Sequence, residues 1–233
     1  MTLHRFIRDA YAAGAVRDAD GKEIALQPHS VEQPDGEALR DLAIAERASR
    51  TIEVGLALGM STLFLCQAVL ESGAEGARHV AVDPYQQESW RGAGLVTLRE
   101  AGVEGIVEVI EEESQLALPE LARQGNQFDL AFIDGDHRFE GVFLDLVFMA
   151  RLVRPGGLIV LDDMWMPAVR LAVSYAERNM GLELVPGLLP DAFTWGRRGP
   201  LSRGVPSGAG RVAALRTPAE APPKPWDGFV RFF

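Results

Sequence analysis

Short apolar runs alternate with longer amphipathic stretches through most of this chain of 233 residues. The runs expected to form strands are 51–55, 79–83, 106–110, 128–134 and 158–161, followed by shorter candidates at 182–185 and 211–215. The stretches expected to form helices are 35–49, 61–71, 87–101, 116–123, 139–152 and 167–180. Strands that alternate with helices in this way are typical of βαβ units. The sequence therefore predicts an α/β protein with a seven-stranded, mostly parallel sheet and helices on both faces.

We expect a single domain with three parts: an N-terminal segment at 1–34, a core at 35–185 and a C-terminal extension at 186–233. The extension contains seven basic residues, three acidic residues and eight of the fourteen prolines. Its first part, 186–210, is expected to be mostly loop. Its aromatic end is expected to pack on the same domain or on a second copy, which would make a homodimer.

The charge balance and the cysteine count limit the classes of protein to consider. The formal net charge of −10 argues against a broad nucleic-acid-binding surface, which needs a basic face. The single cysteine, Cys66, excludes a disulfide within the chain and suits a reducing cytoplasm. Residues 1–15 lack the apolar segment of a signal peptide, and no apolar run has the length of a membrane-spanning helix. We therefore expect a cytoplasmic protein with no membrane partner.

Acidic residues lie in or directly after the expected strands. They are Glu53, Asp83, Asp134 and the pair Asp162-Asp163, and Glu111 to Glu113 follow the remaining strand of the first five. Ligands of open α/β sheets bind beyond the carboxyl ends of the strands. Because like charges repel, a rim with this many carboxylates is expected to face hydroxyl groups, ammonium groups or a metal ion.

The first expected strand runs into a glycine-containing turn, Glu53-Val-Gly-Leu-Ala-Leu-Gly-Met-Ser61. Glycine permits a tight turn and a close approach of the backbone to a ligand. Ala57 stands where the dinucleotide-binding fingerprint has its middle glycine, which disfavours a nicotinamide-dependent dehydrogenase. Asp83, at the end of the next strand, can accept hydrogen bonds from a ribose diol. The alternative is an ordinary turn followed by a surface aspartate, but the two features together favour a nucleoside-bearing ligand.

Four segments together resemble the class I S-adenosylmethionine-dependent methyltransferases. They are EVGLALGMST (53–62), VAVD (80–83), FDLAFIDGDH (128–137) and LVRPGGLIVLDD (152–163), within a resemblance that covers about residues 30–185. More narrowly, the chain is similar to the metal-dependent O-methyltransferases of the catechol, caffeoyl-CoA and macrolide-sugar types, in which the first loop also reads E-x-G-x-x-x-G-x-S. The resemblance implies a Rossmann-like methyltransferase fold. It also implies an enzyme that methylates a hydroxylated small molecule, such as a sugar or a natural product.

The resemblance also implies which residues bind S-adenosylmethionine. Glu53, Gly55 and Gly59 would face its methionine part, with Ser61 close by. Asp83 would hold the ribose hydroxyls, and Glu113 and Ser114 would flank the adenine. Asp134 is placed in the same cofactor-binding set.

Three carboxylates form the predicted metal site: Asp134, Asp162 and Asp163. Carboxylate oxygens and water suit Mg²⁺, and Mn²⁺ is the alternative ion. Alternation along a strand would point Asp162 and Asp163 in opposite directions, but a turn at the strand end can bring both to one ion. The resemblance places the metal on the same three residues. The alternative is that these aspartates only cap the helices that follow.

His137 stands three residues after Asp134, beside the predicted metal. Imidazole can take up a proton near neutral pH, and D-x-x-H supplies a base at the matching position of the macrolide-sugar group. No such role is predicted for His4, His29 or His79. Trp165 could line a pocket for the methyl acceptor, although core packing is the favoured interpretation.

Other functions remain open on the same fold. The acidic residues could be purely structural in a metal-independent methyltransferase acting on a small molecule or on a tRNA base. A non-catalytic module that retains the fold is a further alternative. The basic extension is the feature that favours RNA, whereas the combination of Glu53, Asp83, Asp134 and His137 favours an active enzyme.

Overall fold

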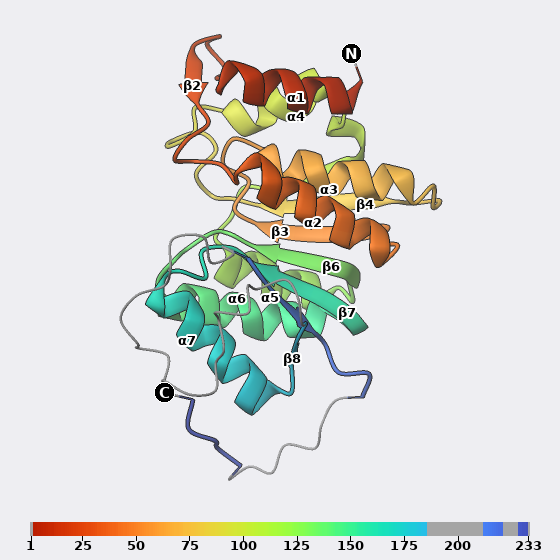
Figure 1. Cartoon of the computed structure of the whole chain (residues 1–233), viewed down its shortest axis with the longest axis vertical. Helices are drawn as coiled ribbons and strands as arrows, with labels where there is room; N and C mark the ends of the chain where they lie inside the picture. Colours follow the sequence, from red (N-terminus) through yellow and green to blue (C-terminus); the bar gives the residue numbers. More distant parts are fainter. Residues whose placement is uncertain (1, 186–211, 221–227, 233) are drawn as a thin grey trace.

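The computed structural model describes residues 2–185, 212–220 and 228–232 (Figure 1). Its helices are α1 (Leu3–Ala13), α2 (Gln33–Ala45), α3 (Met60–Glu71), α4 (Ala93–Ala101), α5 (Ser114–Arg123), α6 (Phe139–Leu152) and α7 (Pro167–Tyr175), with short helical turns η1 (Glu104–Ile106) and η2 (Ala176–Met180). Its strands are β1 (Ala15–Arg17), β2 (Glu23–Ala25), β3 (Arg50–Val54), β4 (Arg78–Val82), β5 (Val107–Ile110), β6 (Phe128–Ile133), β7 (Val153–Leu161), β8 (Glu183–Leu184) and β9 (Ala213–Arg216).

The large sheet has seven strands in the order β5-β4-β3-β6-β7-β9-β8. β3, β4, β5, β6 and β7 pair in parallel, and β9 pairs antiparallel with both β7 and β8. Figure 1 shows α2 and α3 on one side of this sheet and α5, α6 and α7 on the other. The predicted seven-stranded, mostly parallel sheet with helices on both faces is therefore confirmed.

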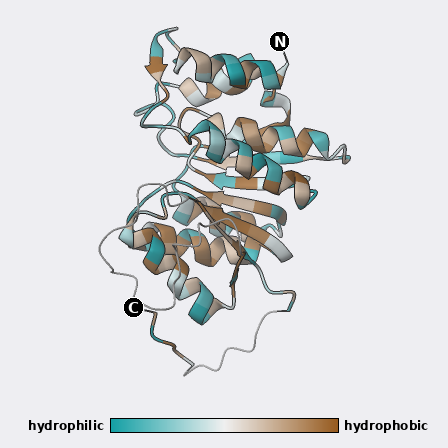
Figure 2. Cartoon of the chain, in the orientation of Figure 1, coloured by the Kyte–Doolittle hydropathy of each residue, from teal (hydrophilic) through white to brown (hydrophobic). Residues whose placement is uncertain are grey.

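The central strands are apolar on both sides because helices cover both faces. In β6, Leu130 and Phe132 point into one apolar cluster, whereas Ala131 and Ile133 point into the other. This alternation is the period of two that a strand imposes on its side chains. The strands in the middle of the sheet are accordingly coloured mainly as hydrophobic in Figure 2. Burial of this kind fixes the register of the strands, and the register in turn fixes where each strand ends.

Several predicted boundaries differ from those observed. The helix expected at 87–101 begins at Ala93, because Gly92 precedes it in a left-handed conformation with φ of +73°. The strand expected at 158–161 begins earlier, at Val153, with an irregular register opposite β6. The helix expected at 167–180 changes to a π-helical turn at Ala176.

The N-terminal segment contains a helix and two strands that were not among the predicted elements. α1 packs against α3 and α4, and β1 and β2 form a separate antiparallel pair. The buried side chains of α1 are Phe6, Ile7 and Ala10, which have the spacing of an amphipathic helix, so the signal for α1 was present in the sequence. Within the ranges that the structure describes, no helix has the length and apolar character needed to cross a membrane.

Part of the C-terminal extension belongs to the domain itself. β9 lies between β7 and β8 in the sheet, and residues 228–232 pack on α7 of the same chain. The carbonyl of Phe232 accepts a hydrogen bond from Ser174, and its ring lies 5.0 Å from the ring of Tyr175. The loop expected at 186–210 lies outside the described residues, and a homodimer stays a prediction.

The packing of α2 on α3 depends on a glycine. A Cβ atom added at Gly36 would overlap the buried ring of Phe64. We therefore expect Gly36→Ala to destabilise the protein by about 1–2 kcal/mol in urea unfolding, because overpacking outweighs the better helix propensity of alanine. Gly105→Ala, which meets no atom within 4 Å, is the matched control. Unchanged or increased stability of Gly36→Ala would contradict this packing.

Candidate active site

A tight loop joins β3 to α3 and brings the ends of β3 and β6 together. Gly55 has φ of +101°, and a Cβ atom there would overlap the carbonyl oxygen of Asp134. The backbone N–H of Asp134 donates to the carbonyl of Val54 at 3.0 Å, which continues the pairing of the two strands. Gly59, with φ of +85°, ends the loop at the N-terminus of α3. Glycine is required at position 55 because both its conformation and the close approach exclude a side chain.

Asp83 holds this loop against the end of β4. Its Oδ2 atom accepts hydrogen bonds from the backbone N–H of Ala57 at 2.7 Å and from Nε2 of Gln86 at 3.1 Å. Its Oδ1 atom accepts from the backbone N–H of Tyr85 at 2.8 Å. A carboxylate offers about four acceptor positions, so these bonds leave about one for a ligand hydroxyl. Asp83 therefore shapes the loop, and its role toward a ribose stays a prediction.

Glu53 lies beneath the first turn of α3 and is fully buried. Its carboxylate accepts hydrogen bonds from the hydroxyls of Ser61, at 2.8 Å, and Thr62. Nε2 of His79 lies 3.2 Å from the same carboxylate, and Nδ1 of His79 lies 2.8 Å from the hydroxyl of Thr51. Glu53 thus holds the first turn of α3 in place through the hydroxyls of Ser61 and Thr62. Its role toward a cofactor stays a prediction.

His79 is a member of this network that sequence reasoning missed. It faces Glu53 because β3 and β4 pair in parallel with Thr51 opposite His79. The available signal was the position of a polar residue inside an otherwise apolar strand. A buried polar side chain in such a place needs hydrogen-bonding partners on a neighbouring strand.

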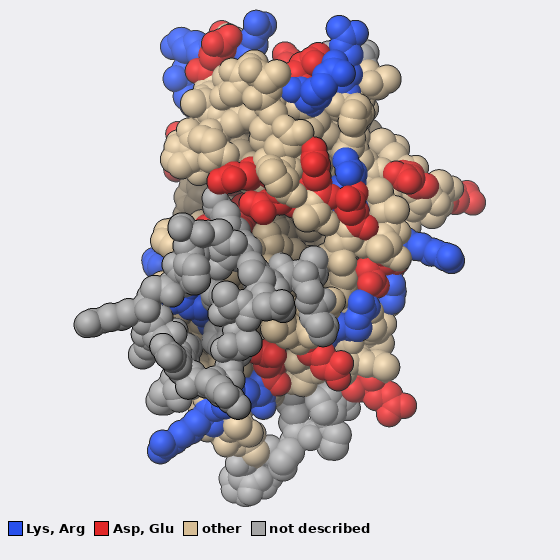
Figure 3. All heavy atoms as spheres, viewed as in Figure 1, with Lys and Arg blue, Asp and Glu red and all other residues tan. Residues whose placement is uncertain are grey.

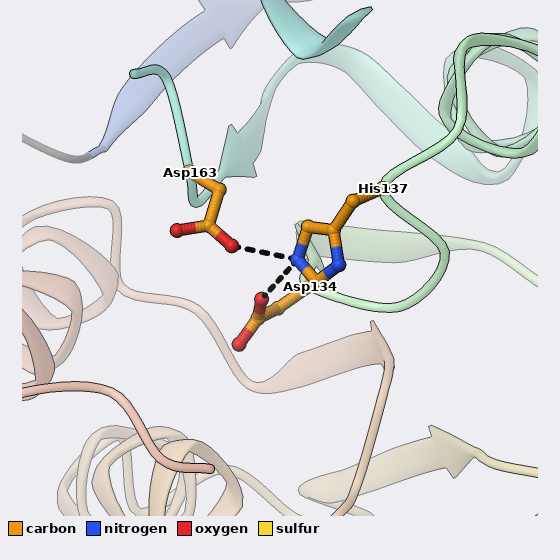
Figure 4. Close-up of side chains that lie close together, drawn as sticks. All are labelled: Asp134, His137 and Asp163. Atoms are coloured by element: carbon orange, nitrogen blue, oxygen red, sulfur yellow. Dashed lines mark ion pairs between the residues drawn. The ribbon is translucent and has the colours of Figure 1, made fainter. Parts of the chain in front are cut away.

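Asp134, His137 and Asp163 converge at the same edge of the sheet (Figure 4). Nε2 of His137 lies 2.7 Å from Oδ2 of Asp163 and 3.5 Å from Oδ1 of Asp134. One ligand atom from each of the three residues lies within 4.8 Å of the others. Asp134 follows β6, His137 precedes α6, and Asp163 follows β7, so the group comes from the connections after two neighbouring strands.

The electrostatics of this group follow from its geometry. Burial raises the pKa of the Asp134 carboxyl, and the charge of Asp163 adds to that rise. Proximity to the carboxylates of Asp134 and Asp163 raises the pKa of the His137 imidazole to about 10. A positive charge between the two carboxylates is therefore favourable, and in this structure the imidazole supplies it.

Asp162 lies outside the group formed by Asp134, His137 and Asp163. Its side chain is buried, and its Oδ1 atom accepts a hydrogen bond of 2.6 Å from the backbone N–H of Asp163. Asp163 adopts a left-handed conformation with φ of +56°. His137 joins Asp134 and Asp163 in the group, and the role of Asp162 as a metal ligand stays a prediction.

Glu113 and Ser114 lie where α5 begins, after β5. Glu113 is exposed and Ser114 is partly buried, so both are at the rim as expected. Asp145 of α6 is a buried acid that the sequence did not single out, and neither of its carboxylate oxygens has a hydrogen-bond partner in the part of the chain that the structure describes. Burial raises the pKa of Asp145 to about 6, and the nearby hydroxyl of Ser114 opposes that rise.

Trp165 differs from the favoured expectation. Its side chain is about half exposed, with a relative accessibility of 50%, so it is not part of the core. Its indole N–H donates a hydrogen bond of 2.7 Å to Oδ1 of Asp163. Trp165 therefore lies at the edge of the group formed by Asp134, His137 and Asp163.

Residues 52–164 match the model of a methyltransferase domain. The chain is 34% identical over 155 residues to the catechol O-methyltransferase of Mycobacterium tuberculosis, a region that covers 66% of this chain and 65% of that protein. It is 32% identical over 151 residues to the caffeoyl-CoA O-methyltransferase of Populus kitakamiensis, covering 64% of this chain and 61% of that protein. The chain thus matches slightly less than two thirds of the length of these relatives.

Solved structures extend the likeness to nearly the whole fold. The O-methyltransferase TomG from Streptomyces achromogenes, in complex with SAM, has a TM-score of 0.64 at 21% identity, covering 93% of this chain and 89% of that one. The O-methyltransferase from Bacillus cereus, in complex with SAH, has a TM-score of 0.62 at 18% identity, covering 92% and 90%. With its seven-stranded sheet and its match to a methyltransferase domain at residues 52–164, the chain is similar to the class I methyltransferases, and in particular to the catechol and caffeoyl-CoA O-methyltransferases.

Proposed function

We propose that this protein transfers a methyl group from S-adenosylmethionine to a hydroxyl oxygen of a small molecule, with the help of a divalent cation, Mg²⁺ or Mn²⁺. The observation that carries the proposal is the convergence of Asp134, His137 and Asp163 beside the Gly55 loop. The similarity to catechol and caffeoyl-CoA O-methyltransferases supports the same chemistry.

The proposed cofactor site lies beyond the ends of β3, β4 and β5. Gly55, Gly59 and Ser61 would face the methionine part, with Glu53 holding the loop from beneath. Asp83 would accept a ribose hydroxyl, Glu113 and Ser114 would flank the adenine, and Asp134 would border the reacting end. The bare backbone at Gly55 fits a ligand that must approach closely. When bound, S-adenosylmethionine supplies an electrophilic methyl group on a positively charged sulfur.

The proposed cation ligands are Asp134 and Asp163, with His137 adjacent. Two carboxylates and an imidazole are donors that hard and borderline divalent ions accept. The two neighbouring carboxylates raise the pKa of His137 to about 10, which indicates a surplus of negative charge at this point that a cation would offset. Such an ion supplies Lewis-acid chemistry that makes an acceptor hydroxyl easier to deprotonate. Asp162 would help to hold Asp163 in place, because its carboxylate accepts a hydrogen bond from the backbone N–H of Asp163.

We assign proton removal to Nε2 of His137. With the carboxylate charges offset, the imidazole can be neutral near pH 7 and can accept the proton of the acceptor hydroxyl. Asp163, 2.7 Å away, then stabilises the imidazolium that forms. The remaining contribution of the chain is to hold the acceptor oxygen in line with the methyl group.

The first test concerns the cofactor. Asp83→Ala removes the carboxylate proposed to hold the ribose and to pin the loop at Ala57. We expect S-adenosylmethionine to bind the wild type in calorimetry and to bind Asp83→Ala at least about tenfold more weakly, as for loss of a charged hydrogen-bonding group. Asp41→Ala, on the exposed face of α2, is the control. Binding of NADH without binding of S-adenosylmethionine would overturn the proposal.

The second test concerns the cation. Methyl transfer from labelled S-adenosylmethionine is followed with a panel of catechols and hydroxylated sugars as acceptors. We expect EDTA to abolish the transfer and added Mg²⁺ or Mn²⁺ to restore it, because the ion is proposed to activate the hydroxyl. Full activity after stringent chelation would instead support a metal-independent methyltransferase.

The third test concerns His137. We expect His137→Ala to lower turnover by about 10²- to 10⁴-fold, the usual contribution of a general base, while calorimetry gives nearly wild-type affinity for S-adenosylmethionine. His4→Ala, in α1 and outside the site, is the matched control. Unchanged turnover in His137→Ala would remove this residue as the base.

A further inference from the structure

We infer that Trp165 is a positioning residue whose indole N–H orients the Asp163 carboxylate for cation binding. This inference rests on the proposed function, because it assumes that Asp163 is a cation ligand. Its basis is the hydrogen bond of 2.7 Å from Nε1 of Trp165 to Oδ1 of Asp163. The other oxygen, Oδ2, lies 2.7 Å from Nε2 of His137. The two oxygens of one carboxylate therefore point to two different neighbours.

The backbone at Asp163 is held in an uncommon conformation. Its φ of +56° lies in the left-handed region, which costs a residue other than glycine roughly 1–2 kcal/mol. The backbone N–H of Met166 donates to the carbonyl of Asp163 at 2.8 Å, and the N–H of Asp163 donates to Asp162 at 2.6 Å. Conformations of this kind persist where surrounding contacts determine them and occur often at functional sites. The turn directs the Asp163 side chain toward His137.

The position of Trp165 is fixed independently of its indole. Arg170 of α7, which is 8% exposed, donates to the carbonyl of Trp165 at 2.6 Å and to the carbonyl of Met164 at 3.2 Å. Met164 is itself fully buried, which anchors the loop on its other side. The backbone that carries the indole is therefore held by contacts that do not involve the ring, so the indole N–H can impose an orientation on Asp163.

Trp165 is an outer residue that donates a hydrogen bond to a proposed metal ligand, Asp163. Hydrogen bonds from outer residues fix the orientation of ligating side chains, and their loss typically weakens metal binding 10- to 100-fold. Because half of the Trp165 side chain is exposed, its ring contributes little to the core. Trp165→Phe therefore removes the N–H and keeps most of the ring, which separates orientation from packing.

The test measures Mn²⁺ binding to the full chain by the electron paramagnetic resonance of free Mn²⁺. We expect Trp165→Phe to bind Mn²⁺ about tenfold more weakly than the wild type, with an unchanged unfolding temperature. Trp90→Phe makes the same substitution at an indole that lies against His29, away from the group, and is expected to keep wild-type affinity. A role in folding alone would lower the unfolding temperature instead.

The outcomes separate the inference from the proposed function. Wild-type Mn²⁺ affinity in Trp165→Phe, with the wild type binding the ion, overturns the inference and leaves the proposed cation site standing. Loss of affinity together with a lowered unfolding temperature also overturns it, because packing then explains the effect. A wild type that does not bind Mn²⁺ overturns the proposed cation site and the inference together.

Discussion

The parallel pairing of β3 with β4 on one side and β6 on the other is the constraint on which the candidate site depends. The chain moves outward from β3 through β4 to β5, then returns to β6 and continues to β7. Connections therefore diverge between β3 and β6, the point where open α/β sheets bind ligands. Gly55 permits the closest approach there, because any Cβ atom would overlap the backbone of Asp134. This close contact between Gly55 and the backbone of Asp134 determines how near the loop after β3 lies to the group formed by Asp134, His137 and Asp163.

The carboxylates of the chain fall into three groups. Glu53, Asp83 and Asp162 are buried, and their hydrogen bonds to the chain hold the loops and strand ends in place. Asp134 and Asp163 instead share one imidazole nitrogen. Further acidic side chains lie along α2, on the face drawn in Figure 3, and contribute to the net charge without taking part in the site. The negative charge of the sequence thus comes from carboxylates that hold the fold, from carboxylates on the surface and from the pair beside His137.

Much of the fold could be predicted because burial on both faces leaves long apolar strands with clear ends. Asp83 and Asp134 follow such strands directly, so their meeting at one edge needed only the parallel sheet. The contact of His79 with Glu53 could not be predicted from the sequence, because it depends on the register of β3 against β4. The direction of the Asp163 side chain depends on one left-handed residue, for which strand alternation gives no signal. Only the structure places the indole of Trp165 against Asp163, since a half-exposed tryptophan and a buried one look alike in sequence.

The most direct test of the account is a crystal of the full chain grown with S-adenosylhomocysteine and Mn²⁺, with diffraction recorded at the manganese edge. The account predicts one anomalous peak in contact with oxygens of Asp134 and Asp163, with His137 adjacent, and the cofactor product along the Gly55 loop with its ribose at Asp83. Bound product with no manganese at Asp134 and Asp163, or manganese at a different place in the fold, would contradict it.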